Sequence, residues 1–281
     1  MIQKIIYALC SIIIIGLSVS GCGKKNGKEI EIRGSRTMEP ALASLAESYS
    51  KNHGAAIKII STGSLKGLTS LSDGTCDMAS SSVKMPAQMV WEAQKKGVIV
   101  KEFIIAYDII VPIVHPSNQI KNLFQGQLAD MYSGLIKDWK VIEIKPGRII
   151  VVERDDNSGT KLLMNERFFE LKKPMETSVK VKSDVDVVNY IARHPSAVGY
   201  VSKRFLTTGV KAVNINGFSG TVENAEKKYY PLSRELYLYA NEKVYAGDVK
   251  SFIDFCTSKT GQDMMKKAGF IPVDLINKQV K

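Results

Sequence analysis

Two long, apolar and β-prone runs constrain what this chain can fold into more than any other feature. They are "KEFIIAYDIIVPIVHPSN" (101–118) and "YYPLSRELYLYANE" (229–242). Each is longer than a typical strand of about 5–6 residues, so each could cross from one domain to another. The chain has 281 residues, which is enough for one large domain or two small ones. Two crossings would leave a cleft between two domains, and such clefts are preferred ligand sites.

The remaining sequence alternates between short apolar segments, typical of strands, and amphipathic segments, typical of helices. Strands are expected at 29–34, 56–61, 76–82, 148–155 and 197–202. Helices are expected at 40–54, 64–74, 86–97, around 127–138, from about 159, at 246–261 and at 261–269. This rhythm predicts an α/β fold with a mainly parallel sheet.

The N-terminal segment is typical of a secretory signal, because Lys4 precedes a long apolar run that ends in small residues. A cysteine follows these small residues directly, which favours a bacterial lipoprotein signal over 1–21 with Cys22 as the lipidated first residue. Residues 22–28 would form a polar tether. An ordinary signal or a membrane helix is the alternative, although the apolar stretch is short for a membrane span. The mature chain is therefore expected to be extracytoplasmic, in the periplasm or on the cell surface, and anchored to a membrane.

The formal net charge is +11, which favours anionic partners. No clustered basic run carries interleaved aromatic residues, so nucleic acid is not an expected partner. The three histidines lie in separate segments without metal-ligand spacing, and neither a metal nor a cofactor is expected. Once Cys10 is removed with the signal and Cys22 is modified, Cys76 and Cys256 remain. They could form one disulfide or stay as two buried thiols.

Four expected strands end in loops that are rich in glycine, serine or threonine and that precede a helix. Helix N-termini present unpaired N–H groups and a positive partial charge, which suits an anion, and hydroxyl groups add further donors. Each loop alone is also consistent with ordinary helix capping. Taken together, the four loops predict an anion pocket. They read "GSRTMEP" (34–40), "TGSLKG" (62–67), "SSSVKMP" (80–86) and "RDDNSGTK" (154–161).

With these motifs in this order, the chain resembles the periplasmic phosphate-binding proteins that serve ABC-type phosphate importers. "RxDxSGT" within "ERDDNSGTK" is the most specific motif of the set. The resemblance implies a type II periplasmic-binding-protein fold, with two α/β lobes, two hinge strands and an oxyanion enclosed between the lobes. The first lobe would comprise 29–107 and 231–281, and the second 108–230.

The resemblance also implies which residues hold the ligand. Arg154 would bind oxyanion oxygens through its fork of N–H groups, and Asp156 would orient Arg154, unless Asp156 caps the next helix instead. Asp155 is expected to point into solvent, and Arg36 is either a further cationic contact or solvent-facing. The implied phosphate-binding residues are Thr37, Met38, Ser64, Ser82, Arg154, Ser158, Gly159 and Thr160.

One position departs from the family pattern. Ser82 stands where many members carry an aspartate that accepts a hydrogen bond from the ligand's own proton. The expected function is nonetheless capture of inorganic phosphate, by a monomer, for the membrane subunits of an ABC transporter. Another tetrahedral oxyanion, such as sulfate or molybdate, is the alternative ligand. An enzyme that hydrolyses phosphate esters is not expected, because Ser158 has no evident histidine partner, and an added role in adhesion or signalling stays open.

Overall fold

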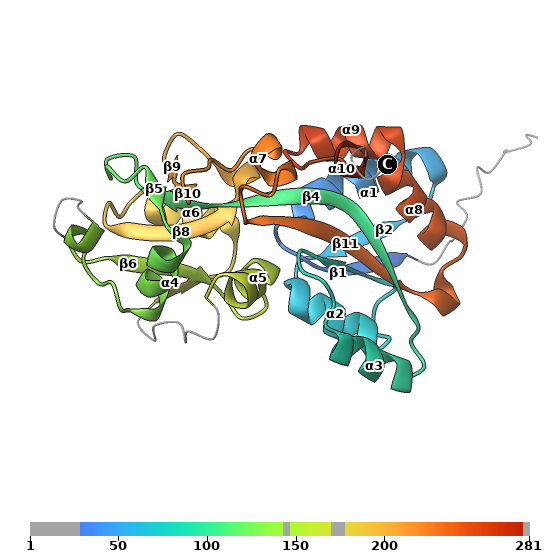
Figure 1. Ribbon diagram of the computed structural model, residues 1–281. Coiled ribbons are helices and arrows are strands. Elements are labelled where there is room, and N and C mark those ends of the chain that lie inside the picture. The colour runs from blue at the N-terminus through green and yellow to red at the C-terminus, as the bar shows by residue number, and fades with distance from the viewer. Residues whose placement is uncertain (1–28, 143–146, 170–177, 278–281) are drawn as a thin grey trace, which may run out of the picture.

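The computed structural model describes residues 29–142, 147–169 and 178–277, which form two lobes side by side (Figure 1). The expected signal, Cys22 and the tether lie outside the described residues. The first lobe contains strands β1 (Ile30–Gly34), β2 (Ile57–Ile60) and β3 (Met78–Ser81). Its helices are α1 (Glu39–His53), α2 (Ser64–Ser72), α3 (Ala87–Lys95), α8 (Gly247–Thr257), α9 (Lys259–Lys267) and α10 (Val273–Asn277).

The second lobe contains short strands and helices. The strands are β5 (Asn122–Leu123), β6 (Ile150–Arg154), β7 (Val179–Val181), β8 (Ala197–Ser202), β9 (Lys211–Ala212) and β10 (Asn214–Ile215). The helices are α4 (Gln125–Ser133), α5 (Gly159–Arg167), α6 (Asp184–Ile191) and α7 (Val222–Glu226). Helix α4 is shorter than the helix expected around 127–138, because Gly134 adopts the left-handed conformation (φ +77°) that ends it.

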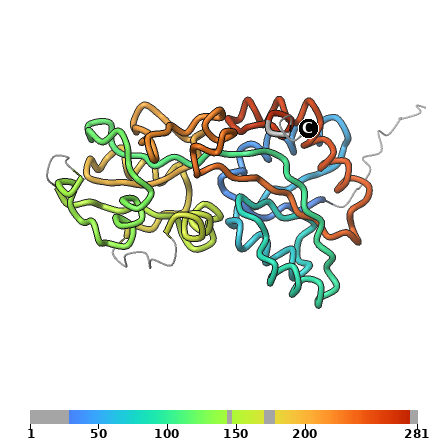
Figure 2. The backbone as a smooth tube through the Cα atoms, in the orientation of Figure 1, coloured from blue at the N-terminus to red at the C-terminus, as the bar shows by residue number. Residues whose placement is uncertain are grey.

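Both long runs are strands that pass between the lobes, β4 (Val100–Val114) and β11 (Ser233–Asn241). Figure 2 shows them running together across the middle of the molecule. They pair antiparallel from Val100 to Ile109 of β4, and from Ile110 onward β4 pairs with β8 instead. One path of paired strands, β2-β1-β3-β11-β4-β8-β6-β7, therefore continues from the first lobe into the second. The pairs β1–β2, β1–β3, β6–β7 and β6–β8 are parallel, as the alternation of strands and helices predicts. The pairs β3–β11, β11–β4, β4–β8 and β4–β9 are antiparallel, so the sheet is mixed and not mainly parallel as expected, because the two crossing strands run against their neighbours.

The buried apolar side chains also separate into lobes. In the first lobe, Leu236 and Leu238 of β11 face a cluster with helices α1, α8 and α9, whereas Tyr237 and Tyr239 face a cluster with α2 and α3. This alternation follows from the two-residue period of a strand, and it leaves helices on both faces of the sheet (Figure 1). The second lobe has its own larger cluster around β6 and β8. The exact lobe boundaries, at 107/108 and 230/231, stay predictions.

Both cysteines in the described part of the chain are free thiols. Cys256 is buried and Cys76 is half-buried. Of the two alternatives, the structure therefore has separate thiols and no disulfide between them. Burial raises the pKa of Cys76 to about 12, so this thiol is protonated and unreactive near neutral pH.

A buried ion pair joins the two hinge strands. Arg234 of β11 lies opposite Asp108 of β4, and its Nε and Nη2 donate to Asp108 Oδ2 at 3.0 and 2.7 Å. Both side chains are almost fully buried, at 1% exposure each. Ser202 Oγ donates to the other carboxylate oxygen at 2.6 Å. Burial raises the pKa of Asp108, and the charge of Arg234 opposes that shift.

We predict that Asp108→Asn strongly destabilises the protein. The substitution leaves the Arg234 guanidinium buried without a counter-charge, and breaking a buried pair in this way costs about 3–5 kcal/mol of the free energy of unfolding. Asp73→Asn is the matched control, because Asp73 pairs with Lys96 at the surface, where both side chains are more than a third exposed. Urea unfolding of both variants would measure the difference. Equal stability of the two variants would contradict the importance given to the hinge pair.

Candidate functional site

The four expected loops come together where the two lobes meet. In the first lobe, Thr37 and Met38 lie at the start of α1, Ser64 is the first residue of α2, and Ser82 follows β3. In the second lobe, β6 ends at Arg154, and Ser158 is the N-cap of α5. The structure thus places three helix N-termini and two strand ends at this contact. All eight residues implied by the resemblance are buried.

The two lobes approach each other closely at Gly159. A Cβ atom added at Gly159 would lie 2.6 Å from Ser64 Oγ and 2.6 Å from Ser82 Oγ, which is closer than real Cβ contacts allow. Beside it, the Leu65 N–H donates to the Asn157 carbonyl across the lobes at 3.2 Å. Residues from the loops 62–67, 80–86 and 154–161 are therefore in direct contact where the lobes meet.

Three of the hydroxyl groups at this contact accept a hydrogen bond from an N–H group. Ser64 Oγ accepts from the Ser82 backbone N–H at 3.2 Å, and Ser158 Oγ accepts from the Lys161 backbone N–H at 3.3 Å. Thr160 Oγ1 accepts from Arg234 Nη1 at 2.9 Å. A hydroxyl that accepts from an N–H keeps its own hydrogen free to donate. The hydroxyls of Ser158 and Thr160 are therefore available as donors to a bound anion. One of Ser64 and Ser82 is also available, because only one of these two hydroxyls, 3.3 Å apart, can donate to the other.

Arg154 is held by Asp184 and not by Asp156. Arg154 Nη1 donates to Asp184 Oδ2 at 2.5 Å, both side chains are at most 2% exposed, and Nη2 donates to the Lys182 carbonyl at 2.8 Å. The side chain of Asp156 is 79% exposed and pairs with Lys161 at 2.7 Å. The expected role of Asp156 is therefore wrong, because its side chain leaves the site at the turn after β6. The bond with Lys161 lowers the pKa of Asp156.

Asp155 does not point into solvent as expected, because it pairs with Arg36 across the lobes. Arg36 Nη1 lies 3.1 and 2.9 Å from the two carboxylate oxygens of Asp155, and Arg36 Nη2 donates to the Thr62 carbonyl. Of the two alternatives for Arg36, a cationic contact and a solvent-facing side chain, neither describes it fully. Its charge is neutralised by the opposite lobe and its side chain is 17% exposed.

Three buried residues of this region were not expected from the sequence: Asp108, Asp184 and Arg234. Asp184 begins helix α6, which was also not among the helices expected from the sequence. The sequence does carry a signal for that helix, since Ser183 and Asp186 form a capping box ahead of an apolar run. No comparable local signal marks Arg234, because it lies inside an apolar strand and its partners are far away in the sequence.

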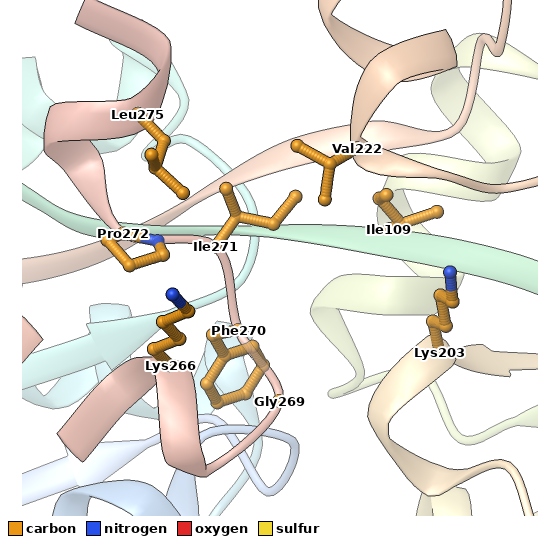
Figure 3. Close-up of a pocket in the computed structure, with 9 residues that line it drawn as sticks. All are labelled: Ile109, Lys203, Val222, Lys266, Gly269, Phe270, Ile271, Pro272 and Leu275. Atoms are coloured by element: carbon orange, nitrogen blue, oxygen red, sulfur yellow. The ribbon is translucent and has the colours of Figure 1, made fainter. Parts of the chain in front are cut away.

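The groove drawn in Figure 3 is a separate feature. It has a volume of about 240 Å³ and a mainly apolar lining that includes Ile109, Phe270 and Ile271, with Lys203 and Lys266 contributed by different lobes. None of the eight implied ligand residues lines it. Over 29–142, 147–169 and 178–277, no group of three or more His, Cys, Asp or Glu side chains could hold a metal ion. Over the same residues, no helix is long and apolar enough to cross a membrane.

Known proteins match this chain over most of its length. In sequence, it is 28% identical to the phosphate-binding protein PstS of Borreliella burgdorferi, over 88% of this chain and 91% of that protein. The Bacillus subtilis protein of the same name is also 28% identical, over 91% and 84%. In structure, it matches a Clostridium perfringens chain described as a phosphate ABC transporter substrate-binding protein with bound phosphate. That match has a TM-score of 0.81 and 30% identity and covers 87% of this chain and 99% of the other.

A structure of an ABC-type phosphate transport receptor from Vibrio cholerae matches with a TM-score of 0.74 and 27% identity, over 87% of this chain and 99% of that one. These matches confirm the two-lobed α/β fold and the resemblance that the motifs indicated. The family model for the PBP superfamily domain matches residues 23–260. The chain therefore belongs to the PBP superfamily.

Proposed function

We propose that this chain is an extracytoplasmic solute-binding protein that captures inorganic phosphate between its lobes and delivers it to the membrane subunits of an ABC transporter. The relatives named as phosphate-binding proteins support this function, and they support a binding protein and not an enzyme. Closure of the lobes about β4 and β11 would enclose the ligand, as in other hinge-closing proteins.

The observation that carries the proposal is the state of the Arg154 guanidinium. Its side chain is 2% exposed, and within the described residues its Nε has no hydrogen-bond acceptor. An unsatisfied buried charged donor costs free energy unless a partner arrives. Free hydroxyl hydrogens on Ser158, Thr160 and one of the paired Ser64 and Ser82 occur in the same region. A tetrahedral oxyanion supplies acceptors in several directions at once and would satisfy both kinds of donor.

Two other functions have less support. Sulfate or molybdate stays the alternative ligand, since Ser82 offers no carboxylate for a ligand proton. A phosphate-ester hydrolase would need a nucleophile beside a general base. The best-placed hydroxyl, Ser158 Oγ, instead caps helix α5 by accepting from the Lys161 N–H, and no histidine contact to it is present in the described part of the chain.

We propose a ligand-binding role for each of the eight residues that the resemblance implies. Arg154 and the hydroxyls of Ser64, Ser158 and Thr160 would donate to phosphate oxygens, joined by backbone N–H groups at the starts of α1 and α5. The backbone N–H of Ser158 is already used, because it donates to the Asp155 carbonyl at 3.0 Å. Ser158 would thus act through its hydroxyl. Thr37, Met38, Gly159 and Ser82 complete the proposed set.

We also propose the lipid anchor on Cys22, which the sequence predicts and which would keep the protein beside its transporter. Acyl chains stabilise membrane attachment by about 0.8 kcal/mol per buried methylene. The protein would then act as a monomer whose lobes lie outside the membrane.

We predict that Arg154→Ala nearly abolishes phosphate binding, because loss of a desolvated, charge-assisted contact costs about 2–5 kcal/mol of binding free energy. Arg154→Lys should also bind weakly, since a point charge cannot replace two N–H groups in a fixed fork. Calorimetry of the detergent-solubilised full chain would measure both. Arg193→Ala is the control, because Arg193 is exposed. Phosphate binding by Arg154→Ala equal to that of the parent would place the site elsewhere.

We predict that Gly159→Ala weakens phosphate binding at least about tenfold. The new methyl group would meet Ser64 Oγ and Ser82 Oγ and so hold the lobes apart. Gly126→Ala is a matched control at a helix start, because nothing lies within 4 Å of its added Cβ. Small-angle scattering with and without phosphate would report closure. Normal closure and affinity in Gly159→Ala would show that the lobes do not need this approach.

We predict that Cys22→Ser releases the protein from membranes or leaves it unprocessed. Mass spectrometry and membrane fractionation would measure this, with Cys10→Ser as the control inside the expected signal. An unchanged mass and membrane fraction in Cys22→Ser would rule out the lipid anchor and leave the phosphate proposal intact.

A further inference from the structure

Thr37 differs from the other hydroxyl residues of the site in the partner it contacts. Thr37 Oγ1 lies 2.8 Å from Asp184 Oδ2, and both residues are buried. The same Oδ2 accepts from Arg154 Nη1, and Oδ1 accepts from the Ser202 backbone N–H at 3.1 Å. A carboxylate that receives donors on both oxygens acts as an acceptor only. Thr37 therefore donates its hydroxyl hydrogen to Asp184.

A threonine hydroxyl has one hydrogen and two lone pairs. With that hydrogen directed at Asp184, Thr37 Oγ1 can offer only lone pairs to any other neighbour. The three hydroxyls that accept from N–H groups are set the opposite way. Ser158 and Thr160 keep their hydrogens free, and so does one of Ser64 and Ser82, so these hydroxyls suit an unprotonated ligand oxygen.

The Ser82 hydroxyl is not fixed in the same way. Its Oγ lies 3.3 Å from Ser64 Oγ, and either atom could be the donor. No carboxylate accepts from this hydroxyl in the described part of the chain, so its hydrogen can turn toward a ligand oxygen. Ser82 is thus a poor candidate for a group that requires a proton on the ligand.

We propose that Thr37, oriented by Asp184, is the group by which this site distinguishes a protonated oxyanion from a fully ionised one. A phosphate O–H would donate to the Thr37 lone pairs, whereas a sulfate oxygen placed there would face an acceptor and the nearby Asp184 charge. The inference rests on the proposed function of oxyanion capture. Asp184 acts as a positioning residue, because it contacts Thr37 and Arg154 and sets the direction of the Thr37 hydroxyl.

The test is the ratio of phosphate affinity to sulfate affinity, measured by calorimetry on the full chain in detergent. Thr37→Val removes the acceptor and keeps the shape, so we expect the ratio to fall at least about tenfold. Thr37→Ser keeps the hydroxyl, and its ratio should stay closer to that of the parent than to that of Thr37→Val. Asp184→Ala removes the acceptor of the Thr37 hydroxyl, which frees its hydrogen for the ligand, so the ratio should also fall about tenfold.

Asp156→Asn is the control for loss of a carboxylate near Arg154, because the Asp156 side chain pairs with Lys161 and not with Thr37 or Arg154 in the described part of the chain. Its ratio should equal that of the parent. Thermal unfolding would show whether Asp184→Ala folds. If it does not, the comparison of Thr37→Val with Thr37→Ser decides the question.

The outcomes separate this inference from the proposed function. A parent chain that binds neither anion would overturn the proposed function. A parent that binds both anions equally would overturn the inference and leave oxyanion capture standing. An unchanged ratio in Thr37→Val would also overturn it. So would an unchanged ratio in a folded Asp184→Ala, because the carboxylate would then not set the direction of the hydroxyl.

Discussion

The ion pair between Arg234 and Asp108 is the interaction on which the rest of the structure depends. It joins the two strands that pass between the lobes, and it extends into each lobe. Arg234 Nη1 reaches Thr160 Oγ1 in the second lobe and lies 3.4 Å from the Ser82 carbonyl in the first. Asp108 accepts a hydrogen bond from the Ser202 hydroxyl, and the Ser202 backbone N–H donates to Asp184. Asp184 in turn accepts from Arg154. One continuous set of buried polar contacts therefore links the hinge to the proposed ligand residues.

The buried charges of this network balance one another. Arg154 pairs with Asp184 and Arg234 pairs with Asp108, so the site carries no large excess of positive charge. Buried pairs of this kind are often no more stabilising than apolar residues of similar volume. Their value here would lie in fixing the direction of donors. An anion would then be held mostly by hydroxyl and N–H dipoles, which suits a protein that must also release its ligand.

Asp155 and Asp156 place negative charge beside this site, and the structure explains why that charge does no harm. Each carboxylate has a cation of its own outside the ligand region. Asp155 pairs with Arg36 of the opposite lobe, and Asp156 pairs with Lys161. The first of these pairs also stabilises the closed arrangement. Because both partners are partly exposed, its contribution is small and depends on salt.

The sequence alone determined the α/β class, the two crossing strands and the loops at the ends of strands, because local periodicity and turn chemistry specify these features. Through a family pattern it also predicted that Ser64 and Gly159 come together, which the structure shows, whereas their ligand roles and that of Arg154 stay predictions. Only the tertiary structure decided which carboxylate holds Arg154. Asp156 is two residues away and Asp184 is thirty residues away along the chain, yet the turn after β6 directs Asp156 outward while α6 brings Asp184 to the arginine. Pairing across long sequence separations depends on how strands and helices pack, and no local pattern encodes it.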